Sequence, residues 1–121
     1  MRVLFVDDDD NMRMIMKDFL AAHGFEVLVA ENGIEAIERV QQDKPDLLIL
    51  DLAMPELDGW NAARRLREIP ENTHLPILAI TAHAFANAGS RALEAGCNAY
   101  LSKPFRPADV LAEVRRLLKI T

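Results

Sequence analysis

Short apolar runs alternate with amphipathic stretches along the whole chain. The runs are typical of strands and cover residues 3–6, 25–30, 46–50, 76–80 and 98–101. Within the third run, residues 47–50 read LLIL without any polar position. An unbroken apolar run of this kind is typical of a central strand that is covered on both faces. The pattern therefore predicts five strands, with the third in the interior of a sheet.

The stretch after the first run has the periodicity of an amphipathic helix. Its apolar residues recur at positions i, i+3, i+4, i+7 and i+8, namely Met12, Ile15, Met16, Phe19 and Leu20. This spacing places them on one face of a helix, which we expect to be buried. Asp9 or Asp10 can cap the helix at its start, and Gly24 can end it.

Four further helices follow, one after each of the remaining runs. Asn32 is the predicted cap of the second helix, and Asp58 is the predicted cap of a third at about residues 59–68. The fourth, at residues 84–94, is a weak helix because it contains a glycine. Pro107 opens the last helix, in a first turn where proline is tolerated. The side chains expected to face inward are Ile34, Ile37, Val40, Trp60, Ala63, Leu66, Val110, Val114, Leu117 and Leu118.

Strands that alternate with helices predict an α/β fold, with a doubly wound, five-stranded parallel sheet and helices on both of its faces. Right-handed crossovers leave few arrangements for such a chain. We expect the flavodoxin-like (βα)5 arrangement, with strand order 2-1-3-4-5. A chain of 121 residues can bury a sizeable core, and we assign residues 1–121 to a single domain.

Composition and charge narrow the classes of function. The chain has 14 basic and 19 acidic residues, and its net charge of −5 argues against bulk attraction to nucleic acid or anionic membranes. A single cysteine, Cys97, excludes an internal disulfide and a thiolate metal cluster, and we expect a cytoplasmic protein. No apolar run approaches the roughly 18 residues of a membrane span, and Met1 leads directly into a strand, so we expect neither a membrane helix nor a signal peptide.

Polar residues directly follow four of the predicted strands. Asp7 and Asp8 come after the first strand, Asp51 after the third, Thr81 after the fourth and Lys103 after the fifth. The carboxyl ends of parallel strands meet at one edge of the sheet, and open α/β sheets bind ligands there. The first and third strands are neighbours in the expected order. We therefore expect the three aspartates to lie together, with Thr81 and Lys103 beside them.

These groups suit phosphoryl chemistry. Two carboxylates at ~4 Å repel by about 4 kcal/mol at an intermediate dielectric constant, so a proton or a cation must neutralise the cluster. An all-oxygen cluster at an accessible edge suits Mg²⁺, or Mn²⁺ in its place. Lys103 adds an ammonium group and Thr81 adds a hydroxyl donor. Asp51 is the natural nucleophile, because carboxylates can form aspartyl phosphates.

Four motifs together resemble those of a known family. They are VDD at residues 6–8, LDLAMPELDG at 50–59, TA at 81–82 and KPF at 103–105. In this combination and spacing, the chain looks like a receiver (response-regulator) domain of two-component signal transduction. The resemblance covers the whole chain. The strand order given above is also the order of this family, so it is not independent of the resemblance.

The resemblance implies a role for each aspartate of the site. Asp51 would accept a phosphoryl group from a phosphohistidine on a histidine kinase or a histidine phosphotransfer protein. Asp8, Asp51 and the main-chain carbonyl of Ala53 would bind Mg²⁺ directly. Asp7 would act through a water molecule on the metal.

The resemblance also implies a switch. Lys103 would contact the phosphoryl group, and its peptide bond to Pro104 is expected to be cis. Thr81 would move toward the phosphoryl group once Asp51 is modified, and Tyr100 would turn inward with it. The face formed by the fourth helix, the fifth strand and the fifth helix would then change shape and contact a downstream protein.

Two positions that vary within this family bear on the lifetime of the phosphoryl group. Ala53 lies two residues after the acceptor and is small, which leaves one side of the site open to water. His83 lies two residues after Thr81 and could cover the site or orient a water molecule. Because these effects oppose each other, the sequence does not predict the lifetime.

The first helix carries a candidate docking surface. Met14 lies almost opposite the apolar stripe of this helix, and Lys17 shares its side. An exposed methionine beside an acidic edge suits docking on the helix bundle of a kinase or a phosphotransfer protein.

Four alternatives compete with this interpretation. A hydrolase of the haloacid-dehalogenase type needs Asp-x-Asp, but Ala53 stands at the second position. A dinucleotide-binding domain needs Gly-x-Gly-x-x-Gly after the first strand, and this motif is missing. A DNA-binding regulator needs a helix-turn-helix segment, and none follows the fifth helix. A pseudo-receiver, a binding module that works without phosphorylation, stays open, although all five site residues are present.

The remaining expectations concern activity, partners and assembly. We expect a switch that catalyses only its own phosphorylation and dephosphorylation and is otherwise not an enzyme. It should contact a kinase and an unidentified protein target, but neither nucleic acid nor a membrane. We expect a monomer, and the sequence leaves open a dimer through the fourth and fifth helices after phosphorylation. Because Met1 leads directly into the first strand, a free-standing or amino-terminal receiver is favoured.

Overall fold

A computed structural model describes residues 1–52, 59–81 and 93–119 of the chain. The strands are β1 (Arg2–Val6), β2 (Glu26–Ala30), β3 (Leu47–Asp51), β4 (Ile77–Thr81) and β5 (Ala99–Ser102). The helices are α1 (Asp10–Ala22), α2 (Gly33–Asp43), α3 (Gly59–Glu68) and α5 (Pro107–Leu118), with a 3₁₀ turn, η1 (Pro70–Asn72), between α3 and β4. Most of the helix predicted at 84–94 lies outside the described residues, and residues 93 and 94 are helical.

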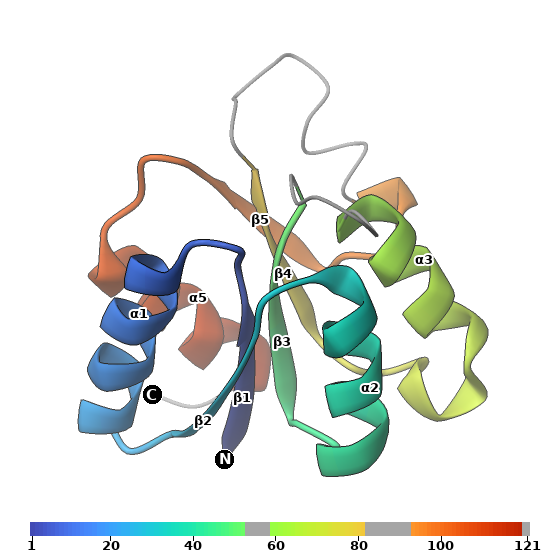
Figure 1. The fold of residues 1–121 in the computed structure, drawn as a ribbon, viewed down its shortest axis with the longest axis horizontal. Helices are drawn as coiled ribbons and strands as arrows, with labels where there is room; N and C mark the ends of the chain where they lie inside the picture. The colour runs from blue at the N-terminus through green and yellow to red at the C-terminus, as the bar shows by residue number, and fades with distance from the viewer. Residues whose placement is uncertain (53–58, 82–92, 120–121) are drawn as a thin grey trace.

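The five strands form one parallel sheet in the order β2-β1-β3-β4-β5. Figure 1 shows α1 and α5 on one face of this sheet and α2 and α3 on the other. The predicted fold class, a doubly wound flavodoxin-like α/β sheet, is confirmed. The predicted neighbours β1 and β3 are paired in the interior of the sheet, as the continuous apolar run required.

The sheet divides the apolar interior into two layers. Alternate side chains of β1 and β3 enter opposite layers, and every position of these strands except the partly exposed Arg2 is buried. The layer beneath α2 and α3 receives Leu4, Val6, Leu48 and Leu50. The layer beneath α1 and α5 receives Val3, Phe5, Leu47 and Ile49.

Side-chain caps define the starts of two helices. Asp9, one of the two predicted candidates, caps α1 by accepting hydrogen bonds from two main-chain amides of the first turn, at 2.9 and 3.3 Å. Asn32 caps α2 in the same way through one amide at 2.8 Å. Gly24 follows α1 with a φ of +94°, a conformation that favours glycine. The predicted cap Asp58 lies outside the described residues.

Two predicted core residues lie on the surface instead. Ile15 is 51% exposed and Ile34 is 48% exposed. On a helix, side chains three residues apart point in directions that differ by about 60°. Ile34 is two such steps from the buried Val40 and therefore points in a very different direction. Ile15 similarly lies at the margin of the stripe that the buried Met16 defines. The other predicted inward side chains are buried or partly buried, namely Met12, Phe19, Leu20, Ile37, Trp60, Ala63, Leu66, Val110, Val114, Leu117 and Leu118.

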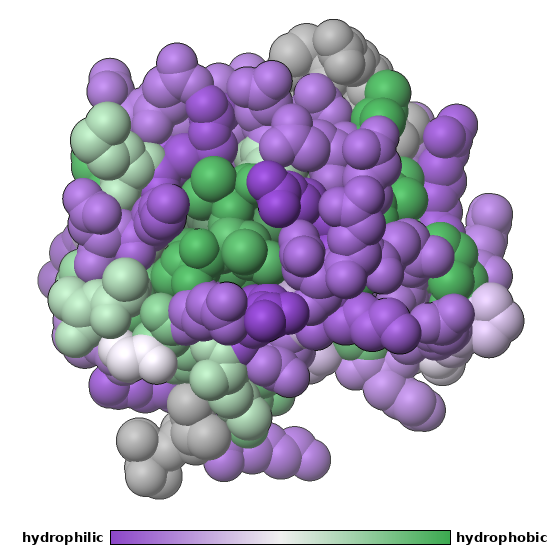
Figure 2. Space-filling model, turned by 60° about the horizontal axis from the view of Figure 1, so that its bottom comes forward, coloured by the Kyte–Doolittle hydropathy of each residue, from purple (hydrophilic) through white to green (hydrophobic). Residues whose placement is uncertain are grey.

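The surface is mostly hydrophilic on the side shown in Figure 2, where hydrophobic side chains gather in one area near the middle of the view. This distribution agrees with the burial of most apolar side chains in the two layers. None of the helices within the described ranges is long and apolar enough to cross a membrane.

Cys97 is the only cysteine of the sequence and belongs to the core beneath α2 and α3. Its side chain is 4% exposed. Burial raises the pKa of its thiol to about 11, although the nearby charge of Arg67 acts in the opposite direction. The thiol is therefore neutral at physiological pH and acts as a small packed side chain.

Candidate functional site

The predicted site residues meet at the carboxyl edge of the sheet. Asp51 and Thr81 are the last residues of β3 and β4, Asp7 directly follows β1, and Lys103 directly follows β5. The register pairs the last residues of β1, β3 and β4 with the last or next-to-last residues of the adjacent strands. Because the strand ends are level, four segments that are far apart in the sequence contribute to one site.

Three carboxylates lie close enough together to bind one cation. Asp7, Asp8 and Asp51 each offer one oxygen, and these oxygens lie within 4.8 Å of one another. Asp7 and Asp51 are each only 1% exposed, whereas Asp8 is exposed. The cluster is therefore fixed on its inner side and open to water on its outer side. Mg²⁺ prefers oxygen ligands and keeps several water molecules, so this set of donors fits Mg²⁺.

Lys103 provides the positive charge of the site. Its Nζ lies 3.1 Å from Oδ2 of Asp51, which accepts a hydrogen bond, and 3.6 Å from Oδ2 of Asp7. Burial lowers the pKa of the ammonium group, but the charges and hydrogen bonds of the two carboxylates outweigh burial and raise it. Lys103 is therefore protonated at neutral pH. Its peptide bond to Pro104 is cis, as the resemblance implied.

Asp7 holds its proton more tightly than an ordinary aspartate. Burial is the main cause, and together with the charge of Asp51 it raises the pKa of Asp7 to about 6. A hydrogen bond from the amide of Asp9 to Oδ1 of Asp7, at 2.9 Å, acts in the opposite direction, as does the charge of Lys103. A cation in the cluster would replace this proton, because both compensate the same excess of negative charge.

Thr81 carries a buried hydroxyl at the end of β4. The residue is 3% exposed, and its Oγ1 has no hydrogen-bond partner within the part of the chain that the structure describes. Leaving such a group unpaired costs about 1–3 kcal/mol. An additional acceptor oxygen at this edge would relieve that cost.

The other predicted residues are exposed on α1 and β5 or lie outside the described residues. Tyr100 on β5 is 47% exposed, and Met14 on α1 is 63% exposed. Lys17, on the same helix, is exposed as well. Ala53 and His83, the predicted contributors to metal binding and to phosphoryl lifetime, lie outside the described residues.

Two residues of this edge were not predicted from the sequence. Arg13 donates a hydrogen bond from Nη1 to the main-chain oxygen of Asp7, at 2.7 Å. Gly59 begins α3 so close to β3 that a Cβ at this position would lie 2.3 Å from the main-chain oxygen of Asp51. An arginine on the polar side of a helix gives no distinct signal, because such residues are usually solvated. The pair Asp58-Gly59 has the signature of a loop, which conceals the packing role of the glycine.

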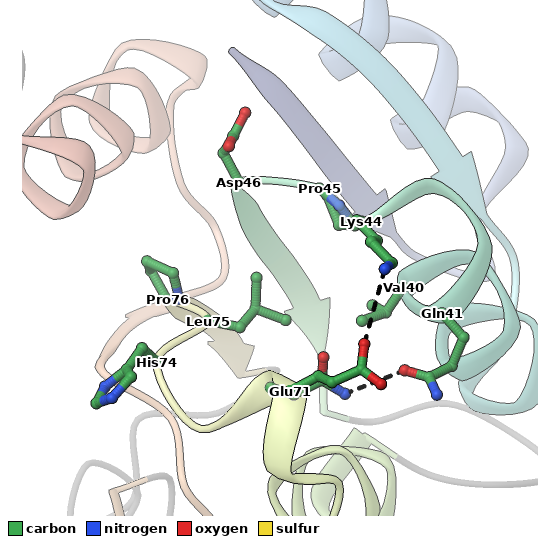
Figure 3. Close-up of a pocket in the computed structure, with 10 residues that line it drawn as sticks. Val40, Gln41, Lys44, Pro45, Asp46, Glu71, His74, Leu75 and Pro76 are labelled. Atoms are coloured by element: carbon green, nitrogen blue, oxygen red, sulfur yellow. Dashed lines mark hydrogen bonds and ion pairs between the residues drawn. The ribbon is translucent and has the colours of Figure 1, made fainter.

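A cavity of about 280 Å³ lies at the opposite edge of the sheet, between the end of α2 and the segment that joins η1 to β4 (Figure 3). Four of its polar side chains form two pairs. Nζ of Lys44 lies 3.7 Å from Oε2 of Glu71, and Nδ2 of Asn72 donates to Oε1 of Gln41 at 3.4 Å. None of the predicted site residues lines this cavity. The candidate site is therefore the carboxyl edge.

The fold and this edge define a doubly wound α/β domain with an acidic cluster, a lysine and a buried hydroxyl at the carboxyl ends of its strands. The chain belongs to the response regulator receiver domain family, whose family model matches residues 3–115. It is thus a receiver domain of two-component systems rather than a typical enzyme.

Individual proteins agree with this assignment. The response regulator MprA from Mycobacterium leprae (strain TN) is 42% identical over 121 residues, which are 100% of this chain and 52% of that protein. The chain spans about half the length of the curated relatives that it matches. A putative response regulator from Chloroflexus aurantiacus J-10-fl has a TM-score of 0.91 at 37% identity, covering 98% of this chain and 97% of that chain. Chemotaxis protein CheY4 from Vibrio cholerae has a TM-score of 0.90 at 29% identity, covering 96% and 97%.

Proposed function

We propose that this domain accepts a phosphoryl group on Asp51 from a phosphohistidine of a histidine kinase or a histidine phosphotransfer protein. One observation carries the proposal. The buried carboxylate of Asp51 lies 3.1 Å from the ammonium group of Lys103 and belongs to a cluster with Asp7 and Asp8. An acceptor carboxylate needs an ionised oxygen and nearby positive charge for the incoming phosphoryl oxygens. Asp51 supplies this oxygen, and Lys103 supplies one positive charge beside it.

In the proposed reaction, a carboxylate oxygen of Asp51 attacks the phosphorus atom. The P–N bond to the histidine breaks, and its electron pair stays on the ring nitrogen. Asp8, Asp51 and the main-chain carbonyl of Ala53 would hold Mg²⁺, or Mn²⁺, with Asp7 acting through a bound water. The cation would compensate the charge of the phosphoryl oxygens. Lys103 would exchange its bond with Asp51 for a bond to a phosphoryl oxygen.

We propose that Thr81 and Tyr100 transmit the modification. The hydroxyl of Thr81, for which the described part of the chain offers no partner, would find an acceptor on the modified Asp51. The exposed ring of Tyr100 would turn inward with it. The face formed by the fourth helix, β5 and α5 would then change its contacts with a protein target. Ala53 and His83 would set the lifetime of the modified state, with effects of opposite sign.

We also propose that Met14 and Lys17 help to dock the phosphate donor. The exposure of Met14, 63%, supports this role, and the neighbouring Ile15 extends the apolar surface. Met14→Lys should slow phosphotransfer from the partner without affecting phosphorylation by a small phosphodonor. Ile34→Lys, at an apolar residue of α2 that is 48% exposed, is the matched control. Unchanged transfer to Met14→Lys would remove the docking role.

The test of the proposed function is the intact mass of the protein after incubation with acetyl phosphate, with and without Mg²⁺. We expect the gain of one phosphoryl group that requires both Mg²⁺ and Asp51. Asp51→Asn should not be modified, whereas Asp18→Asn, at an exposed aspartate of α1, should react like the wild type. If the folded protein gains no phosphoryl group, the alternative gains support, namely a pseudo-receiver that binds a partner without phosphorylation.

Location and assembly stay expectations from the sequence. We expect a cytoplasmic protein with a single domain over residues 1–121 and no contact with nucleic acid or a membrane. We expect a monomer, which would form a dimer only after phosphorylation. Size-exclusion chromatography before and after reaction with acetyl phosphate tests the assembly.

A further inference from the structure

Arg13 connects three segments beside the acidic cluster. Its Nη1 donates a hydrogen bond to the main-chain oxygen of Asp7 at 2.7 Å. Its Nη2 pairs with Oδ1 of Asp10 and lies 3.8 Å from Oε2 of Glu31. The side chain is 15% exposed, so this guanidinium group is largely removed from water. Arg13 thus joins the turn after β1, the first turn of α1 and the loop between β2 and α2.

The carbonyl that Arg13 binds belongs to the peptide group between Asp7 and Asp8. Rotation of this peptide group would move both carboxylates relative to β3. Two further hydrogen bonds hold Asp7 itself. The amide of Asp7 donates to the main-chain oxygen of Ala30 at 3.2 Å, and Oδ1 of Asp7 accepts from the amide of Asp9 at 2.9 Å. The hydrogen bond from Arg13 fixes the next peptide group, which connects Asp7 to Asp8.

Arg13 has two opposing effects on a cation in the cluster. Its positive charge repels the cation, although Asp10 and Glu31 partly compensate that charge. Its hydrogen bond, in contrast, preorganises two of the three carboxylates. A guanidinium group is planar and makes several hydrogen bonds in a fixed geometry, which an ammonium group at the same position does not reproduce. The two effects can therefore be separated by substitution.

We infer that Arg13 is a positioning residue for the cation site, which holds the peptide group between Asp7 and Asp8 so that both carboxylates meet Asp51. This inference rests on the proposed use of the cluster as a Mg²⁺ site. Residues that orient metal ligands through hydrogen bonds contribute to metal affinity without touching the metal.

Calorimetric titration of the metal-free protein with Mg²⁺ tests this role. Arg13→Lys keeps the charge but loses the planar donor, and Arg13→Met loses both. Loss of an orienting partner weakens metal binding by about ten-fold or more, so we expect both variants to bind Mg²⁺ about ten-fold more weakly. Arg39→Met is the matched control, because it removes an arginine that pairs with Asp43 on α2. It should bind like the wild type.

The unfolding midpoint of each metal-free variant, measured in parallel, separates a positioning role from a general loss of stability. A lower midpoint with unchanged Mg²⁺ affinity would overturn the inference. Unchanged affinity in Arg13→Lys with tighter binding in Arg13→Met would overturn it as well, since charge alone would then account for the effect. If the wild type does not bind Mg²⁺, the proposed function fails together with the inference. If the wild type and both variants bind equally, only the inference fails.

Discussion

Gly59 lies against the main chain of Asp51 so closely that no side chain fits between them. A Cβ on Gly59 would lie 2.3 Å from the main-chain oxygen of Asp51 and 2.4 Å from Cα of Leu52. The amide of Gly59 donates to the main-chain oxygen of Leu52 at 3.2 Å. The start of α3 is thus fixed to the end of the strand that carries the proposed acceptor.

Gly59→Ala should therefore destabilise the protein and displace Asp51. Because main-chain atoms are in the way, we expect a loss of about 1–3 kcal/mol in the free energy of unfolding, as for an overpacked core. Urea denaturation measures the loss. Gly24→Ala is the control, since a Cβ there has no neighbour within 4 Å and only its φ of +94° opposes the change. Both variants are then compared for Mg²⁺ binding, and only Gly59→Ala should alter it. Equal Mg²⁺ affinities would contradict this prediction.

The raised pKa of Asp7 predicts how stability depends on pH in the metal-free protein. The pKa is about 6 in the folded chain, compared with an ordinary value of 3.8. The folded state therefore binds this proton more tightly than the unfolded state does. The resulting stabilisation is complete below about pH 4 and is lost as the pH rises through about 6.

Asp7→Asn should remove this dependence, because asparagine is neutral at every pH. We expect the variant to be more stable than the wild type by about 3 kcal/mol at neutral pH and to approach it at about pH 4. Urea denaturation in the presence of a chelator, at a series of pH values, measures the difference. A difference that does not vary with pH would show that Asp7 titrates normally.

The buried hydroxyl of Thr81, which has no hydrogen-bond partner among residues 1–52, 59–81 and 93–119, predicts a stabilising substitution. Thr81→Val keeps the shape of the side chain and removes this polar group, so we expect a gain of about 1 kcal/mol in the unmodified protein. Thr73→Val is the control, because Oγ1 of Thr73 donates to the main-chain oxygen of Pro70 at 2.8 Å. That variant should gain nothing. A loss of stability in Thr81→Val would mean that the hydroxyl is satisfied in solution.

Arg67 fastens α3 to the turn before β5. Its Nε donates to the main-chain oxygen of Gly96 at 2.8 Å, and its Nη2 donates to Oδ1 of Asn98 at 2.8 Å. Gly96 has a φ of +105°, and a Cβ there would lie 2.7 Å from Cγ of Arg67. Arg67→Ala should cost about 2 kcal/mol in urea denaturation, because several acceptors lose their donor. Arg64→Ala, at an exposed arginine of the same helix, should change stability by less than about 0.5 kcal/mol.

The sequence predicts the carboxyl edge well because its geometry follows from topology. Once β1 and β3 are neighbours in a parallel sheet, Asp7 and Asp51 must end at the same edge, whatever the details of packing. Long-range contacts of polar side chains do not follow in this way. The bond of Arg13 to the main chain of Asp7 depends on a rotamer and on a local turn, and neither is encoded in a periodic pattern.

Helix faces show the same limit. The periodic pattern predicts which side of α1 and α2 is buried, but it does not predict the width of the buried stripe. Ile15 and Ile34 lie at or beyond its margin. Positions three residues apart on a helix do not point in the same direction, so a run of such steps leaves the buried face.

The division of the core by the sheet has a consequence for how a chemical change spreads. Among the described residues, the side chains of the two layers form separate sets, and β1 and β3 contribute alternately to both. Substitutions in one layer therefore have no direct contact through which to disturb the other. The backbones of the strands are the common boundary, and a displacement at their carboxyl ends moves both layers at once. The packing of one helix pair can thus change without changing the packing of the other. Both pairs still respond to a displacement at the carboxyl edge, because both pack on the same strands.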